Sequence, residues 1–237
     1  MRKGLIGLLA VAVVVIVGLY FAMGMKSPAV DANNVQPAAN ASEEAPVPAP
    51  AAESTADEHG KTYALGDPNA PIKIKEYASL SCSHCADFAT NTFPQVKKDL
   101  IDTGKVYFEF VHFPLNAPAM DGALVALCMP EERYHQFVSF LFEQQAQWAF
   151  NQDYRQILKQ NAKLLGASEE KLEACLNDEA KKAEIVKTMQ EAGAKHDIRS
   201  TPSFVVNDKV TFGGAMSFDD FKKRIEEVST DDQKVAE

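Results

Sequence analysis

The sequence predicts a mixed α/β fold in which a strand–helix–strand unit and a strand–strand–helix unit are separated by a helical insert. Three observations predict it: two strand-like segments with a helical stretch between them, a long region of helical periodicity, and two further strand-like segments followed by an amphipathic helix. All three lie within residues 61–237, and the helical insert spans about 117–195. One folded domain, preceded by a different kind of N-terminal region, is therefore expected.

The first unit begins with a strand over residues 72–80, where isoleucines alternate with lysines before the run turns apolar. A helix is predicted from about Cys82. It should be kinked at Pro94, because proline cannot donate the helical hydrogen bond. Residues 105–115, "KVYFEFVHFPL", form a second strand rich in β-branched and aromatic residues. Strand, helix and strand at this spacing predict parallel neighbours in one sheet.

The insert, residues 117–195, shows no convincing strand. Apolar residues recur every three or four positions, and Pro130, Gly166 and Gly193 divide the stretch into several helices. The strand pattern returns in "PSFVVNDKVTFGG", which predicts two antiparallel strands around a tight Asn207–Asp208 turn. A last helix begins near Ser217, whose hydroxyl can cap free amide groups.

The N-terminal 26 residues, "MRKGLIGLLAVAVVVIVGLYFAMGMK", differ in composition from the rest of the chain. Arg2 and Lys3 precede an uncharged stretch that is long enough, at ~1.5 Å per helical residue, to cross a ~30 Å hydrocarbon core. Residues 1–26 are therefore expected to be either an uncleaved signal anchor or a signal peptide, with Ala22–Gly24 as a tolerable cleavage site. In both cases the basic end stays cytoplasmic and the rest of the chain reaches the far side of the membrane.

Residues 27–60 are rich in alanine and proline and carry six acidic residues with no lysine or arginine. Such a segment has little to bury, so it is expected to be a disordered linker, which suits a retained membrane anchor. The whole chain has a net charge of −9 and no basic cluster, which argues against a nucleic-acid partner.

The strongest chemical motif is "SLSCSHCADF", residues 79–88, in which Cys82 and Cys85 are two residues apart. A cysteine at a helix N-terminus faces unpaired N–H groups and the positive end of the helix dipole, which lower the pKa of its thiol. Cys82 is therefore the expected attacking sulfur, and Cys85, one turn further on, the resolving one. His84, when protonated, would add a charge partner for the thiolate and make the oxidised pair a stronger oxidant.

Other interpretations of the motif are weaker. Structural zinc and iron–sulfur clusters generally need a second ligand pair, which the remaining Cys128 and Cys175 do not supply as a motif. A Cu(I) site made by the two sulfurs and His84 stays possible, as does a purely structural disulfide. We expect no metal and no cofactor.

Three segments together carry a resemblance to a known family: "KEYASLSCSHCADF", the helical region after it, and "RSTPSFVVNDKVTFGG". Over residues 61 to about 230 the chain resembles bacterial periplasmic DsbA-like thiol-disulfide oxidoreductases, which have a thioredoxin fold with a helical insertion. The resemblance implies that Thr201–Pro202 is a cis-proline pair that binds an extended substrate peptide by its backbone. It also implies that Glu76 is a buried acid that assists proton transfer to Cys85, and strand alternation agrees by pointing Glu76 inward.

The resemblance further implies a localisation and partners. The domain should lie in the periplasm, anchored to the inner membrane or soluble if the N-terminal segment is cleaved. Its substrates should be folding exported proteins that contain cysteines, and a quinone-linked membrane protein should reoxidise it. Nothing in the linker looks like a dimerising element, so a monomer is expected. The Ser83–His84 dipeptide departs from the Pro-His of the best-known members, which leaves the redox potential open.

Cys128 and Cys175 both fall in the helical insert. In a compartment that permits disulfides, an internal bridge between them is expected, with two buried free thiols or a regulatory pair as the alternatives.

Three functions compete at this stage. A dithiol oxidase would use an oxidised Cys82–Cys85 pair to introduce disulfides into exported proteins. An isomerase or reductase would hold the same pair reduced, and usually gains from oligomerisation. A non-catalytic copper-binding module would show no turnover.

Overall fold

The computed structural model describes residues 63–235, which form a mixed α/β domain. The predicted membrane segment and the predicted linker, residues 1–26 and 27–60, lie outside the described residues. Among the helices within 63–235, none combines the length and the apolar character needed to span a membrane.

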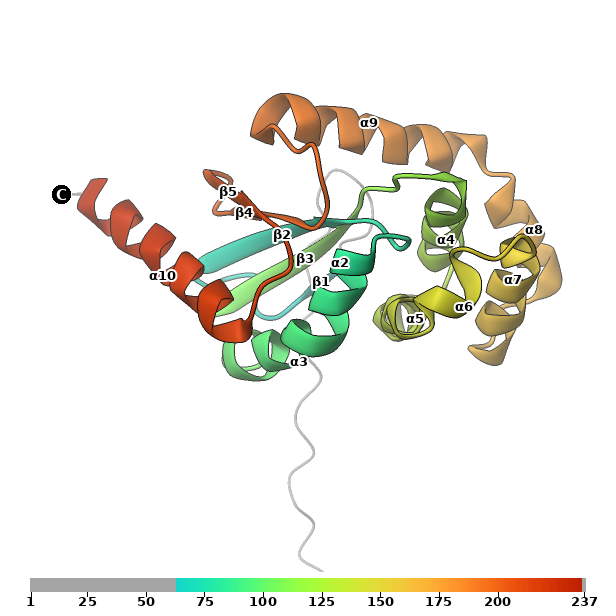
Figure 1. Cartoon of the computed structure of the whole chain (residues 1–237), viewed down its shortest axis with the longest axis horizontal. Helices are drawn as coiled ribbons and strands as arrows, with labels where there is room; N and C mark the ends of the chain where they lie inside the picture. Colours follow the sequence, from blue (N-terminus) through green and yellow to red (C-terminus); the bar gives the residue numbers. More distant parts are fainter. Residues whose placement is uncertain (1–62, 236–237) are drawn as a thin grey trace, which may run out of the picture. The chain divides into compact units, whose positions relative to one another are not determined.

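A five-stranded sheet forms the centre of the domain, with strand order β1-β3-β2-β4-β5 (Figure 1). The strands β2 and β3 are parallel, and the other neighbouring pairs are antiparallel. Their bounds are β1 Ala64–Leu65, β2 Ile72–Ala78, β3 Val106–His112, β4 Ser203–Val206 and β5 Val210–Gly213. The predicted parallel unit and the predicted antiparallel pair are both present. Asn207 and Asp208 form the turn between β4 and β5 with positive φ angles of 50° and 60°.

The short edge strand β1 is absent from the prediction. It pairs with β3 through Ala64 opposite Glu109 and Leu65 opposite Phe108. Two residues are too few to show an alternating pattern, so the sequence gives no periodic signal there. The chain then turns at Gly66, whose φ of 100° favours glycine; an added Cβ would also meet Val106 O at 2.5 Å.

Helices cover both faces of the sheet and form the insert. Their bounds are α2 Ser83–Asp87, α3 Phe93–Val96, α4 Ala117–Leu127, α5 Glu131–Glu143, α6 Gln145–Trp148, α7 Tyr154–Leu164, α8 Glu169–Leu176, α9 Glu179–His196 and α10 Phe218–Val235, with π-helical segments η1 Phe88–Thr92 and η2 Lys97–Ile101. Around Pro94, where the sequence predicts a kink, the helical stretch alternates between α-helical and π-helical segments. This proline lies in the first turn of α3, where a missing N–H is tolerated, and a π-helical segment precedes that turn.

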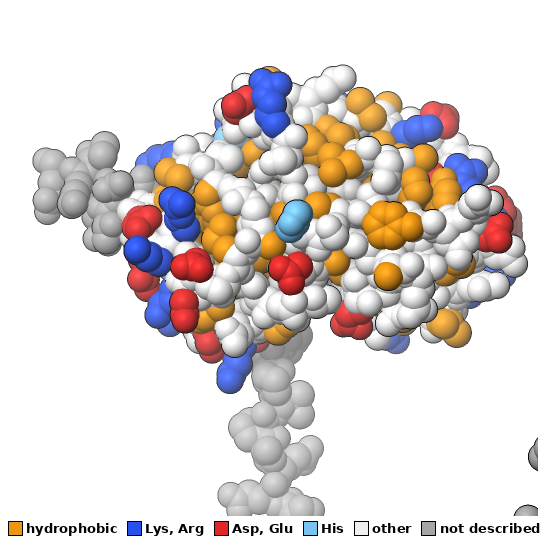
Figure 2. All heavy atoms as spheres, in the orientation of Figure 1, with side chains coloured by type: hydrophobic (Ala, Val, Ile, Leu, Met, Phe, Trp, Pro, Cys, Tyr) orange, Lys and Arg blue, Asp and Glu red, His pale blue; other side chains and the backbone are white. Residues whose placement is uncertain are grey.

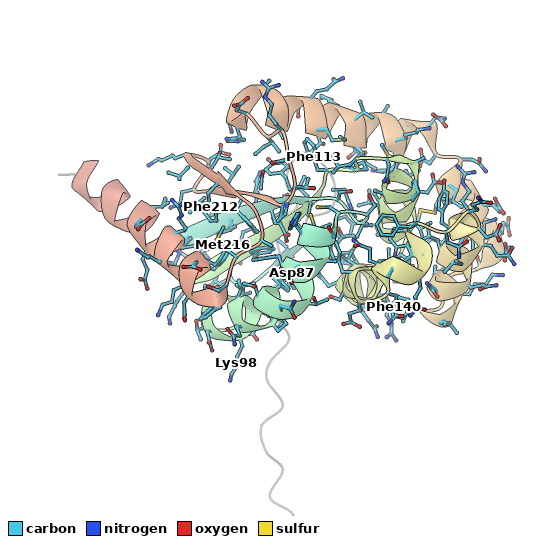
Figure 3. The ribbon with its side chains drawn as sticks, viewed as in Figure 1. Asp87, Lys98, Phe113, Phe140, Phe212 and Met216 are labelled. Carbon is cyan, nitrogen blue, oxygen red and sulfur yellow. A yellow bond between two sulfur atoms is a disulfide. The ribbon has the colours of Figure 1, made fainter. Side chains whose placement is uncertain are left out.

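The two faces of the sheet have separate cores. On one face, Phe88, Phe204 and Phe221 pack together between the sheet and the helices α2 to α3 and α10, with ring centroids 4.7 to 5.3 Å apart. On the other face, α9 supplies Ala192, which packs with Tyr77 and Phe113. Figure 3 shows Phe113 below α9, at the end of the strand β3. The sheet is thus held rigidly from both sides, and its strand ends can fix a site.

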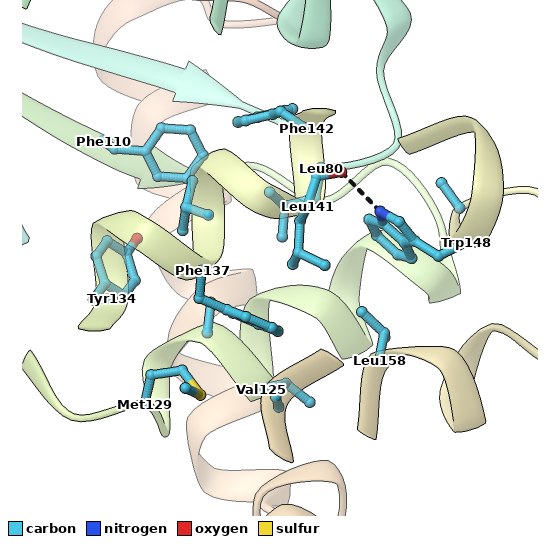
Figure 4. Packing of buried hydrophobic residues seen from close by; sticks show 14 of the residues in the cluster. Leu80, Phe110, Val125, Met129, Tyr134, Phe137, Leu141, Phe142, Trp148 and Leu158 are labelled. Carbon is cyan, nitrogen blue, oxygen red and sulfur yellow. Dashed lines mark hydrogen bonds between the residues drawn. The ribbon is translucent and has the colours of Figure 1, made fainter. Parts of the chain in front are cut away.

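The insert has a large apolar core of its own, which continues to the end of β2 (Figure 4). Trp148 is fully buried there, and its Nε1 donates a hydrogen bond of 2.8 Å to Leu141 O. Leu80, directly before the Cys82 motif, belongs to the same cluster. The helical insertion predicted from the sequence is therefore confirmed, and it packs against the motif segment.

A disulfide joins Cys128, at the end of α4, to Cys175 in α8, with Cα atoms 6.2 Å apart. It links two helices of the insert across a sequence separation of 47 residues.

Removal of this bridge is expected to destabilise the domain. A Cys128→Ala/Cys175→Ala variant should lose about 4 kcal/mol of unfolding free energy, because its unfolded chain gains the entropy of an open loop. Urea unfolding of both proteins under oxidising conditions measures the loss. An unchanged midpoint, with the bridge verified in the parent by peptide mapping, would show that it does not stabilise the fold.

Candidate active site

The candidate site forms where the chain leaves β2 and enters α2. Cys82 N donates to Ser79 O at 3.0 Å and closes a turn, so that Cys82 becomes the N-cap residue of α2 with an extended backbone. Ser79 Oγ accepts a hydrogen bond from Leu115 N at 3.3 Å, which ties the turn to the segment after β3. The predicted strand-to-helix junction is thus where the structure places the motif.

The two sulfurs of the motif differ in exposure. Cys82 is partly exposed, whereas Cys85 is fully buried, and the structure holds both as free thiols. The described site is therefore that of the reduced protein. Cys82 Sγ lies 3.3 Å from Thr201 O, a neighbour 119 residues away in the sequence.

The surroundings of Cys82 lower the pKa of its thiol to about 5. The largest cause is a hydrogen bond from the Cys85 thiol, and the backbone N–H groups of Cys85 and His84 add to it against the opposing effect of burial. The Thr201 hydroxyl is buried without a partner among the described residues and is placed to donate to the thiolate. At neutral pH, Cys82 is therefore a thiolate, the reactive form of a thiol.

Cys85 has the opposite character. The pKa of its thiol is raised far above the ordinary range, first by its hydrogen bond to the Cys82 sulfur and then by burial, and Glu76 contributes as well. Cys85 is thus a protonated partner that stabilises the Cys82 thiolate. It is a poor nucleophile while that contact lasts.

Glu76 lies in the middle of β2, opposite Phe110 in β3 and Phe204 in β4. Its side chain is buried, and its Oε1 has no hydrogen-bond partner among the described residues. Burial, followed by the negative charge on Cys82, raises the pKa of this carboxyl from 4.5 to about 8. Glu76 is therefore an acid that holds a proton at neutral pH, and it interacts electrostatically with Cys82 and Cys85.

The loop before β4 completes the site. The Thr201–Pro202 peptide bond is cis. The strand pair behind it holds the loop in place, since Gly214 N donates to Pro202 O at 2.9 Å and Ser203 Oγ donates to Ser200 O at 2.7 Å. Segments at opposite ends of the domain sequence thereby meet at Cys82.

His84 lies on the exposed side of α2, and within residues 63–235 no hydrogen bond or ion pair joins its imidazole to a sulfur. Its backbone N–H, by contrast, supports the Cys82 thiolate. On the face drawn in Figure 2, apolar side chains lie exposed over the region of the helical insert. The residue whose ring is predicted to stabilise the thiolate is thus exposed.

Sequence reasoning missed two buried polar contacts near the site. Gln145, the first residue of α6, donates from Nε2 to Leu80 O at 2.9 Å and to Cys82 O at 3.0 Å. His112 shares a 3.0 Å hydrogen bond with Tyr134, and burial lowers the pKa of His112 to about 3, so its ring is neutral. Gln145 lies in the predicted helical insert and His112 in a predicted strand. No local motif in either stretch indicates a buried polar contact.

The described residues contain no group of three or more histidine, cysteine, aspartate or glutamate side chains that could hold a metal ion.

The acidity of Cys82 is directly testable. In the reduced protein, the ultraviolet absorbance of the thiolate should titrate with a midpoint near pH 5, well below the pKa of ~8.5 of a free thiol. A Cys82→Ser variant should lose this transition, because the hydrogen bond to the Cys82 sulfur goes but burial still raises the pKa of Cys85. A midpoint above pH 8 in the parent protein would contradict the described environment.

Comparison with known proteins places this chain in a family. The Thioredoxin family model matches residues 58–227. The crystal structure of alpha-DsbA1 from Wolbachia pipientis superposes with a TM-score of 0.66 at 31% identity, over 74% of this chain and 94% of that one. Disulfide bond formation protein D of Bacillus subtilis is 29% identical, over 68% of this chain and 74% of its own.

A relative from Rickettsia typhi, whose name proposes a protein-disulfide oxidoreductase, is 32% identical over 72% of this chain. The match spans 63% of that relative's length. Fold and site thus define a thioredoxin-like protein with a helical insertion. Within that class, the chain belongs to the DsbA-like proteins.

Proposed function

We propose that this protein is a dithiol oxidase that introduces disulfide bonds into other proteins. One observation carries the proposal: Cys82, partly exposed and acidic, faces the cis-proline loop while its partner Cys85 is buried and protonated. A stabilised Cys82 thiolate lowers the free energy of the reduced pair. The oxidised pair therefore gains stability when it takes electrons from a substrate.

The first step forms a mixed disulfide. A substrate thiolate attacks Cys82 Sγ, the Cys82–Cys85 bond breaks, and Cys85 leaves as a thiolate that takes up a proton. Glu76 is the proposed source of this proton, because it is buried, interacts with both sulfurs and is protonated at neutral pH.

The second step releases the product. A second substrate thiolate attacks the substrate sulfur of the mixed disulfide, which forms the substrate disulfide and expels Cys82 as a stable thiolate. Two electrons have then passed from the substrate to the Cys82–Cys85 pair. The substrate lies extended along Thr201–Pro202, where backbone pairing gives a loose sequence preference. The outward-facing His84 would contact the substrate and tune the potential.

The biological setting follows from the same proposal. Residues 1–26 would deliver the domain to the periplasmic side of a bacterial inner membrane, either as an anchor or as a cleaved signal, with residues 27–60 as the linker to the domain at 61–237. The substrates would be exported proteins that contain cysteines. Reoxidation of the monomer would be the task of a quinone-linked membrane partner.

Two assays test the function. The oxidised protein should restore activity to reduced, unfolded RNase, and its Cys82–Cys85 pair should be reduced readily by glutathione at equilibrium. A protein that reactivates only scrambled RNase, and does so only while its Cys82–Cys85 pair is kept reduced, would instead support the isomerase or reductase alternative. Failure in both assays would support the third alternative, a non-catalytic module.

A further inference from the structure

The buried side chain of Gln145 connects the helical insert to the redox motif. It is 6% exposed, and its Nε2 lies 2.9 Å from Leu80 O and 3.0 Å from Cys82 O. Two carbonyl oxygens converge on one end of the amide. That end must be the NH₂ group, because an oxygen there would face two acceptors.

The two carbonyls that Gln145 binds flank Ser81, immediately before α2. Cys82 is the N-cap residue of α2, and its O also accepts a hydrogen bond from Ala86 N at 3.1 Å. This is the first backbone hydrogen bond of the helix. Gln145 therefore fixes the backbone on both sides of the step into the helix. This stretch of backbone sets the direction of the Cys82 side chain. It therefore also sets how Cys82 lies beside the N–H groups of His84 and Cys85.

The position of Gln145 is itself fixed by packing. It opens α6, and the same short helix ends at Trp148, which is fully buried and hydrogen-bonded to Leu141 O. A Cβ added at Gly122 in α4 would lie 3.1 Å from Leu80 Cδ1 and 3.2 Å from Trp148 Cη2. The insert and the motif segment thus pack closely here, and the amide has little freedom to move.

We infer that Gln145 is a positioning residue through which the helical insert sets the acidity of Cys82 and the redox equilibrium of the Cys82–Cys85 pair. The inference deepens the proposed oxidase function and rests on it for its biological meaning. Without the amide, the motif backbone loosens, the helix N–H groups hold the thiolate less well, and the reduced form loses stability relative to the disulfide. The protein becomes a weaker oxidant.

The test compares Gln145→Leu and Gln145→Met with the parent protein, and Gln147→Leu, on the exposed side of α6, is the matched control. In both Gln145 variants, the acid dissociation constant of the Cys82 thiol should be about threefold to tenfold smaller than in the parent. This is the range expected for the loss of one neutral hydrogen bond. The equilibrium with glutathione should shift toward the protein disulfide by a similar factor. Gln147→Leu should change neither.

A merely structural role predicts a different result: a lower urea midpoint with an unchanged thiol titration and an unchanged glutathione equilibrium. That outcome would overturn the inference. If the apolar variants do not fold, Gln145→Asn, whose shorter amide cannot span both carbonyls, is judged by the same two readouts. Neither readout needs a protein substrate, so they decide the role of Gln145 independently of the RNase assays.

Discussion

Cys85→Ser protein is expected to accumulate as a stable mixed disulfide when it is mixed with a small disulfide or a disulfide-containing peptide. Cys82 keeps its exposure, its helix N–H groups and its contact with Thr201 O, so its thiolate still attacks. The resolving sulfur is missing, so the adduct persists. Mass spectrometry should show one adduct per chain at Cys82, and RNase oxidation should fall to the uncatalysed rate.

The Cys82 thiol should also become less acidic in this variant, because the largest cause of its low pKa is the hydrogen bond from Cys85. A serine hydroxyl replaces that donor only in part, so the thiolate titration should move upward from about 5. The control is Cys82→Ser, in which the buried Cys85 should form no adduct. An adduct at Cys85 in that control would contradict the assignment of the attacking sulfur.

Local sequence patterns predict much of this site, but they do not predict the contacts between segments that are far apart in the sequence. The run of apolar residues before Cys82 predicts a strand that ends at the motif, and the structure places the helix start there because Ser79 closes the turn. The contact between Cys82 and Thr201, 119 residues away, is predicted only by the resemblance to a known family, because no local pattern in either segment specifies it. Neither the local patterns nor the resemblance predicts the role of Gln145. A polar residue in a helical stretch reads as surface until packing shows it buried.

The outward ring of His84 shows the same limit. Its position between the cysteines suggested a charge partner for the thiolate, but residue i+2 of a helix start turns away from the N-cap side chain. The contribution that the structure assigns to His84 comes from its backbone N–H. Any residue other than proline at this position would supply that N–H, so this contribution does not depend on the imidazole ring.

Glu76 is expected to give the reduced protein a pH-dependent stability that few surface acids could produce. Its pKa is 4.5 as a free group and about 8 in the fold, because burial and the nearby Cys82 charge disfavour the carboxylate. Between these values the folded chain binds more protons than the unfolded chain, so the free energy of unfolding falls as pH rises. The fall attributable to Glu76 is about 3 to 5 kcal/mol from pH 4 to pH 8.

Glu76→Gln removes this dependence because it keeps the volume and loses the charge. The variant and the parent should differ little in urea unfolding at pH 4, and the variant should be more stable at pH 8. Glu132→Gln, on the exposed surface of α5, removes the same charge without the burial and should keep the slope of the parent. Equal slopes for Glu76→Gln and the parent would mean that Glu76 is not held as a buried acid, and the proposed proton source for Cys85 would fail with it.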